Sequence, residues 1–222
     1  MIIFRNGKLL NRQSIYKEIS WLPVLFWIII PVCFWSFSNN MIENTLSIFT
    51  LLSVYFFLKS TDSANQYTLL ILSGLSIFLA SFTKGIPGLF TISVPLIYFI
   101  TYHRNNFSKA IFQTLILIGI PVLIYGVLIM FPDSRQSLSN YFYGRLLLRI
   151  NDHPTVDSRF YILYRLFNEL LPVILISLVI LFFTRKNNLK ENLNTIQKTF
   201  WFLFLTGLAG SVPLMLTLVQ KG

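Results

Sequence analysis

The sequence predicts an all-α protein, a polytopic bundle of transmembrane helices, from two observations. The first is composition: 55% of the 222 residues are hydrophobic and only 12% are charged, with a mean hydropathy of +0.66. Soluble domains have about twice that share of charged residues. The second is spacing, because apolar runs of near-membrane length recur along the chain between polar connections. A water-soluble core could not hide this much apolar surface.

About seven membrane segments are expected. They are Trp21–Phe37, Thr45–Leu58, Tyr67–Phe82, Gly88–Tyr102, Ala110–Phe131, Phe167–Phe183 and Phe200–Val219. Several are shorter than the roughly 20 residues that an α-helix needs to cross the hydrocarbon. No internal repeat and no linker of biased composition divides the chain. We therefore expect residues 1–222 to form a single transmembrane domain.

The distribution of charge predicts the orientation. If the connections alternate between the two sides, the side of the N-terminus has eleven Lys and Arg with three acids, and the other side has seven with five acids. Basic loops are retained in the cytoplasm, so the N-terminus is expected there. It shows no secretory signal pattern, which agrees. Because the basic residues lie in short tracts between apolar runs, nucleic acid is not an expected partner.

Two residues on the predicted non-cytoplasmic side are candidates for chemistry. Glu43 is the charged residue of the connection that follows the first segment, and Lys84 is that of the reversal between the third and fourth segments. Each also has an ordinary structural explanation. With Asn40 as helix N-cap, Glu43 would have the capping-box spacing. A lysine at a helix end can simply reach the lipid headgroups instead of binding a phosphate.

The long polar segment 132–161 is expected on the same side, with an amphipathic helix lying along the interface. Its apolar residues recur every four positions, at Leu138, Phe142, Leu146 and Ile150. This period puts Arg145 and Arg149 on one face, where a bridging anion would relieve their repulsion. That anion is either a substrate phosphate or a lipid headgroup. His153 follows as a candidate for substrate binding, although a polar loop residue is the plainer explanation.

The two short connections resemble motifs of a known family. The stretch Asn39–Leu46 resembles the place where membrane glycosyltransferases of the GT-C fold carry an acid at an outer helix start. The stretch Leu79–Leu89 is similar to the Leu-Thr-Lys-Gly-Pro-x-Gly-Leu turn of family 39, the bacterial protein mannosyltransferases and lipid A aminoarabinose transferases. Here Ile86 separates the first glycine from the proline. The family's first outer loop, with its usual catalytic acid, is not found before Trp21, so we expect a fragment or a shortened reading frame.

The resemblance implies an enzyme of the bacterial inner membrane. It would take a sugar from a polyprenyl-phosphate donor at the periplasmic face and pass it to a lipid, protein or glycan acceptor. Glu43 would be the catalytic residue, orienting the acceptor, a metal or the base, and Lys84, Arg145, Arg149 and His153 would bind substrate. Cations would stabilise the departing lipid phosphate. No cofactor is certain, and a divalent metal remains open.

Two other classes of function fit part of the pattern. A polytopic transporter or lipid flippase would explain the spans and the basic loops, but it should show polar or broken helices near the bilayer midplane and often a repeat. Neither feature is evident in the sequence. A non-catalytic membrane subunit or scaffold is the third reading, and a truncated enzyme would behave much like one.

Overall fold

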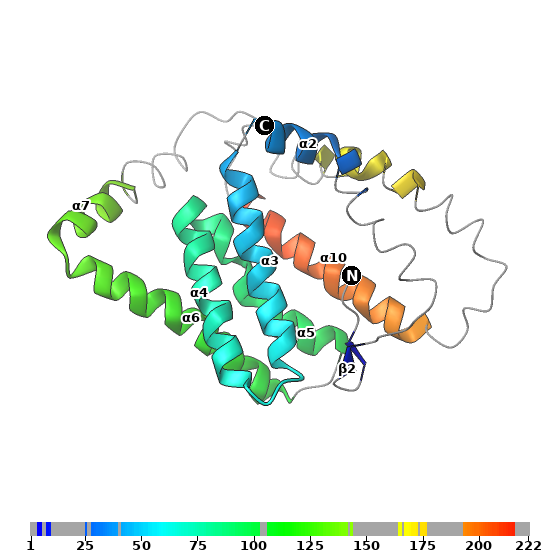
Figure 1. Cartoon of the computed structure of the whole chain (residues 1–222), viewed down its shortest axis with the longest axis horizontal. Helices are drawn as coiled ribbons and strands as arrows, with labels where there is room; N and C mark the ends of the chain where they lie inside the picture. Colours follow the sequence, from blue (N-terminus) through cyan, green and yellow to red (C-terminus); the bar gives the residue numbers. More distant parts are fainter. Residues whose placement is uncertain are drawn as a thin grey trace.

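A computed structural model of the chain describes residues 4–5, 8–9, 25, 28–39, 41–102, 106–141, 143, 164–165, 167–172, 174–176 and 193–215. A two-stranded antiparallel pair, β1 (Phe4–Arg5) and β2 (Lys8–Leu9), comes first. The helices that follow are α2 (Pro31–Ser38), α3 (Ile42–Ser60), α4 (Gln66–Lys84), the 3₁₀ helix η1 (Ile86–Ser93), α5 (Val94–Tyr102), α6 (Phe107–Ile129), α7 (Pro132–Tyr141) and α10 (Leu193–Met215). The predicted all-α membrane bundle is confirmed (Figure 1).

Three of the described helices are long and apolar enough to cross a membrane, namely α3, α4 and α6. The second and third predicted segments lie within α3 and α4, and α6 covers the fifth except for its last two residues. The faces that they turn away from the bundle are rich in exposed apolar side chains, among them Leu51 on α3 and Leu123 on α6, which are 69% and 70% exposed. Such a surface is stable against lipid tails and not against water.

The fourth predicted segment has a different local structure from the others. It consists of η1 followed directly by α5, which together have 17 residues. A 3₁₀ helix rises by about 2.0 Å per residue and an α-helix by 1.5 Å, so the two would extend about 30 Å, close to the hydrocarbon thickness. The tighter winding therefore compensates for the small number of residues.

The remaining three predicted segments lie partly outside the described residues. In the first, α2 covers residues 31–38. In the sixth, residues 167–172 and 174–176 are helical. The seventh overlaps α10, a helix of 23 residues with described bounds Leu193 and Met215, from Phe200 to Met215.

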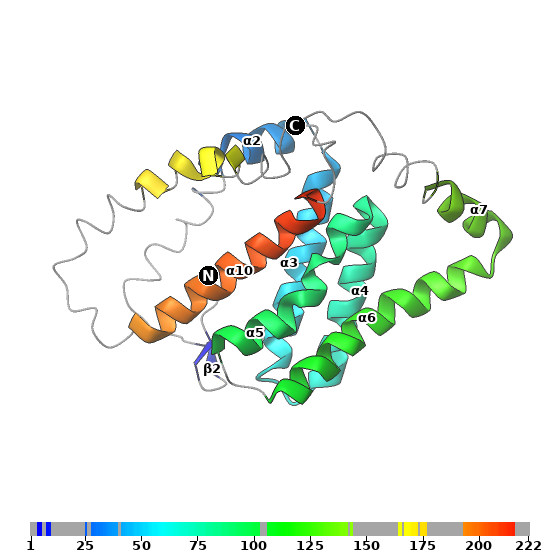
Figure 2. The same cartoon turned by 180° about the vertical axis from the view of Figure 1, so that it is seen from behind.

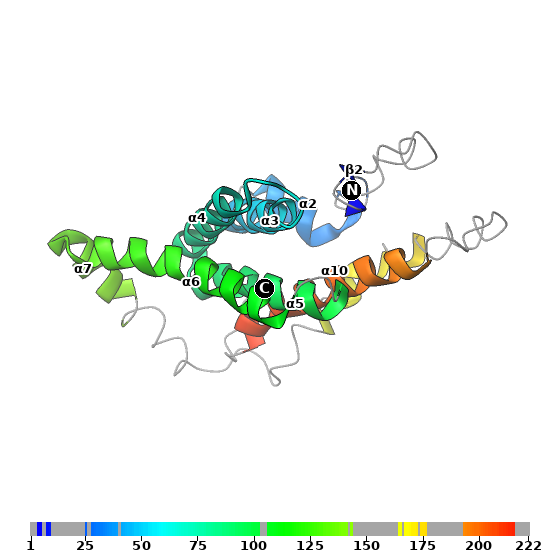
Figure 3. The same cartoon turned by 90° about the horizontal axis from the view of Figure 1, so that it is seen from below.

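The helices pack in two layers, with α3 and α4 in one and α5, α6 and α10 in the other (Figure 3). Small residues allow α4 to approach its neighbours closely, as is common in membrane bundles. The Ser73 hydroxyl on α4 donates to the Ser53 carbonyl on α3 at 2.8 Å. On another side of α4, Gly74 leaves room for Ile120 of α6, since a Cβ at this glycine would lie 2.5 Å from the Ile120 Cδ1 atom.

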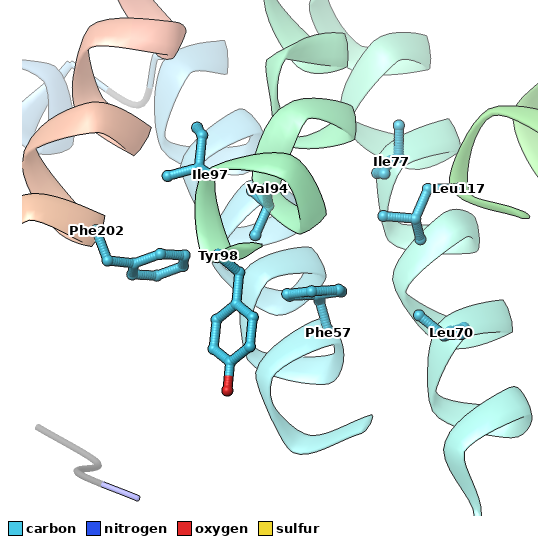
Figure 4. Close-up of a cluster of buried hydrophobic side chains, with 8 residues drawn as sticks. All are labelled: Phe57, Leu70, Ile77, Val94, Ile97, Tyr98, Leu117 and Phe202. Carbon is cyan, nitrogen blue, oxygen red and sulfur yellow. The ribbon is translucent and has the colours of Figure 1, made fainter. Parts of the chain in front are cut away.

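The core lies between the two layers and contains side chains from five elements (Figure 4). These are Phe57, Leu70, Ile77, Val94, Ile97, Tyr98, Leu117 and Phe202. The Tyr98 ring forms T-shaped pairs with Phe57 and Phe202 at centroid distances of 5.7 and 6.1 Å, an arrangement that aromatic rings prefer. Tyr102 adds a hydroxyl contact to Thr199 at 3.1 Å. These contacts fix α10 alongside α5 (Figure 2).

Candidate functional site at one end of the bundle

The reversal after α4 positions the first site residue, Lys84. Gly85 adopts a φ of +76°, a conformation that residues with a side chain rarely adopt, and its N–H donates to the Ser81 carbonyl at 2.6 Å. Gly88 then lies against the backbone of α4, where a Cβ would approach the Ala80 carbonyl carbon to 2.4 Å. Both glycines are thus required by the turn. Ile86, the residue that separates the motif's glycine and proline, is the first residue of η1.

The start of α3 positions the second site residue, Glu43. The predicted capping box with Asn40 as N-cap is wrong, because the N-cap is Met41 and Glu43 is the second helical residue. A thioether is a poor capping acceptor. The start of the helix is held instead by Asn44, whose side-chain amide donates to the Ser36 carbonyl at 2.9 Å and accepts from the Ser36 hydroxyl at 3.2 Å.

Because α3 and α4 run in opposite directions, the start of one and the end of the other lie at the same end of the bundle, which we call the site end. There the Lys84 Nζ atom forms a hydrogen-bonded ion pair with the Glu43 Oε1 atom. The side chains are 34% and 48% exposed, so the pair remains accessible from solvent. Ion pairs this exposed contribute at most about 1 kcal/mol to stability. The pair is therefore easily opened by a competing ligand.

A residue of α7 contacts the same turn. The Tyr141 hydroxyl donates to the Lys84 carbonyl at 3.4 Å. A Cβ at Gly85 would lie 2.0 Å from this hydroxyl oxygen, so the absence of a side chain at Gly85 is what lets Tyr141 approach. A further hydroxyl contact, of 3.0 Å between Ser81 and Tyr125, joins the last turns of α4 to α6. The site end thus combines α3, α4, α6 and α7.

The structure brings together two of the five predicted site residues, Glu43 and Lys84. The other three, Arg145, Arg149 and His153, lie outside the described residues. The helix expected in the long segment is present at its start as α7, which contains Leu138. Phe142, Leu146 and Ile150 are not described. Tyr141 and Asn44 were not predicted to act at the site.

The open question of a divalent metal can be tested on the described part of the chain. Within it, no group of three or more His, Cys, Asp or Glu side chains is arranged to hold a metal ion. The Glu43 carboxylate is a single ligand and is already paired with an ammonium group. Among the described residues, the site end therefore supplies one carboxylate and not a complete set of metal ligands.

The fold and the pair define a class: an integral membrane protein with an acid and a cation at one end of its helical bundle. The family model for dolichyl-phosphate-mannose-protein mannosyltransferase matches residues 7–134, more than half of the chain, and the match contains both Glu43 and Lys84. The chain belongs to this family and is thereby a membrane glycosyltransferase, as the resemblance to GT-C family 39 implied. No curated protein and no solved structure matches the chain significantly.

Proposed function

We propose that this protein transfers a sugar from a polyprenyl-phosphate donor to a hydroxyl group of a lipid, protein or glycan acceptor. Residues 1–222 would form one transmembrane domain of the bacterial inner membrane. The N-terminus would lie in the cytoplasm and the site end in the periplasm, in line with the distribution of basic residues. The observation that carries the proposal is the Glu43–Lys84 pair, in a chain of a glycosyltransferase family.

The position of Lys84 suits a lipid phosphate. It is the last residue of α4, a helix long enough to cross the hydrocarbon, so its ammonium group would lie near the level of the headgroups. A polyprenyl chain in the bilayer presents its phosphate at this level. The ammonium would bind the phosphate and stabilise the negative charge that grows on it as the sugar leaves.

The first of the predicted arginines follows closely in the chain after a residue that contacts Lys84. Tyr141 contacts the Lys84 carbonyl, and Arg145 follows Tyr141 by four residues. Four residues extend over at most about 14 Å. We propose that Arg145, Arg149 and His153 supply further contacts to the phosphate or the sugar, as the resemblance implies.

The proposed reaction is a displacement at the anomeric carbon. The acceptor oxygen attacks this carbon, the bond from carbon to phosphate oxygen breaks, and the electron pair leaves with the phosphate as polyprenyl phosphate. The proton of the acceptor hydroxyl passes to the Glu43 carboxylate, which also orients the hydroxyl for attack. A carboxylate at a partly exposed position can reach an acceptor from the aqueous side.

The test is sugar transfer by Glu43→Gln in the full-length protein in membranes, supplied with a labelled polyprenyl-phosphate sugar. Removing a general base lowers rates by about 10²- to 10⁴-fold, so we expect a loss of at least about 100-fold. The matched control is Asp133→Asn, which removes an exposed acid of α7 near the same end of the bundle. It should keep transfer within about twofold. Equal transfer by Glu43→Gln and the control, at equal membrane levels, would overturn the assignment.

A further inference from the structure

The Lys84 ammonium group is held by a carboxylate of its own chain. Glu43 and Lys84 come from different helices, and their contact is set by the packing of α3 against α4. The packing itself is fixed deeper in the bundle, where the buried hydroxyls of Ser53 and Ser73 meet at 3.2 Å. The two charged groups are therefore held near each other whether or not they remain paired.

A lipid phosphate that binds Lys84 meets this carboxylate as a competitor. Two anions that approach one ammonium repel each other, and the exposed fractions of the two side chains give both room to move. The intramolecular contact contributes little to stability at this exposure, and a phosphate also forms charge-assisted hydrogen bonds to an ammonium group. Phosphate binding should then open the pair.

We propose that Glu43 is an internal counterion which the donor phosphate displaces from Lys84. The inference rests on the proposed function, because it assumes that Lys84 is where the donor phosphate binds. Displacement couples two events at one site: the phosphate gains the ammonium, and the carboxylate is released. The released carboxylate can then accept a hydrogen bond from the acceptor hydroxyl. An acceptor that arrives before the donor finds Glu43 engaged by Lys84.

A signature separates this exchange from a direct role of Glu43 in holding the donor. If Glu43 competes with the phosphate, neutralising it tightens phosphate binding while it abolishes transfer. If Glu43 holds the donor or merely supports the fold, the same change weakens binding. The expected gain in affinity is about three- to tenfold, since the phosphate no longer has to displace the carboxylate from Lys84.

The experiment measures binding of a short-chain polyprenyl phosphate without a sugar to the purified full-length protein in detergent. Glu43→Gln should bind about three- to tenfold more tightly than the unmodified protein, and Lys84→Met at least about tenfold more weakly. In the Lys84→Met background, Glu43→Gln should change affinity by less than about twofold. This non-additivity is the mark of an interaction that passes through Lys84.

The control Asp133→Asn removes the same charge without a lysine partner among the described contacts, and it should leave affinity within about twofold. The inference is overturned if Glu43→Gln binds no more tightly than the unmodified protein, if Asp133→Asn gives the same gain, or if the gain persists without Lys84. Loss of binding through misfolding is recognised by size-exclusion elution of the variants. Because the ligand has no sugar, this binding measurement does not depend on sugar transfer. A protein that binds as expected but transfers no sugar would contradict the proposed function and not the displacement of Glu43.

Discussion

Lys59 and Lys84 occupy equivalent positions at opposite ends of the bundle, and their surroundings differ. Each lies in the last turn of its helix, α3 or α4, where a positive charge is favoured by the helix dipole. Lys59 lies over the ring of Tyr55 on its own helix, 5.7 Å from the ring centroid. Lys84 pairs instead with Glu43 from the neighbouring helix. Local helix chemistry explains both lysines, and at Lys84 the tertiary structure adds an acid from another helix.

The connections next to these lysines differ in the same way. After Lys59, hydroxyl groups satisfy the last carbonyls of α3: Ser60 donates to Phe57 at 2.6 Å and Thr61 to Leu58 at 2.8 Å. After Lys84, the chain turns at a glycine with positive φ that also makes room for Tyr141. The first connection closes a helix end, whereas the second arranges several elements around a charged group.

The largest effect should come from exchanging the two lysines for a neutral residue of similar length. Lys84→Met is expected to lower sugar transfer by at least about 100-fold, because the positive charge that stabilises the leaving phosphate is lost. Lys59→Met should change transfer by less than about twofold. The measurement is the initial rate with a lipid-linked sugar at equal protein levels. Similar losses in both variants would mean that the lysines support the fold alike and that the two ends do not differ.

A smaller effect is expected from filling the turn at the site end. Gly88→Ala places a methyl group against the backbone of α4, and such overpacking costs about 1–3 kcal/mol. The matched control is Gly126→Ala on α6, where a Cβ meets nothing within 4 Å. Thermal unfolding in detergent should show a lower Tm for Gly88→Ala only. A Tm unchanged from that of the control would show that α4 and η1 do not pack as described.

The smallest effect should come from Tyr141→Phe, which removes the hydroxyl that contacts the Lys84 carbonyl. Because this bond is long, at 3.4 Å, we expect transfer to fall by about two- to threefold. Tyr67→Phe, at the exposed start of α4, serves as the control and should have no effect. No difference between the two variants would remove Tyr141 from the site, and a loss above about tenfold would give its hydroxyl a larger role.

The sequence predicted the fold class and placed Glu43 and Lys84 on the same side of the membrane, but it did not predict their direct contact. Alternating apolar segments assign both residues to the same side of the membrane, and the structure places them in contact. The bounds of α3 were less accurate, since the predicted segment began at Thr45 and the helix begins at Ile42. Polar residues at a helix start lower the hydropathy, although Asn44 stabilises the helix start through its bonds to Ser36.

Other features depend on contacts that a single sequence does not reveal. The 3₁₀ winding of η1 accompanies the close approach of Gly88 to Ala80, and sequence alone only predicted an apolar segment from Gly88 onward. Tyr141 belongs to the amphipathic helix expected in the long segment, but its contact with Lys84 joins residues 57 positions apart. A tyrosine four residues before Arg145 was a signal that could have drawn attention to it.

The end of the bundle with Glu43 and Lys84 should face the periplasm, and cysteine labelling of whole cells tests this orientation most directly. Cys33 is the chain's single cysteine, so Cys33→Ser provides a background without thiols. On that background, Asp133→Cys lies near the site end and Asn106→Cys at the opposite end of α6. An impermeant maleimide should label Asp133→Cys in intact cells and Asn106→Cys only after permeabilisation. The reverse pattern would place the pair in the cytoplasm and contradict the account.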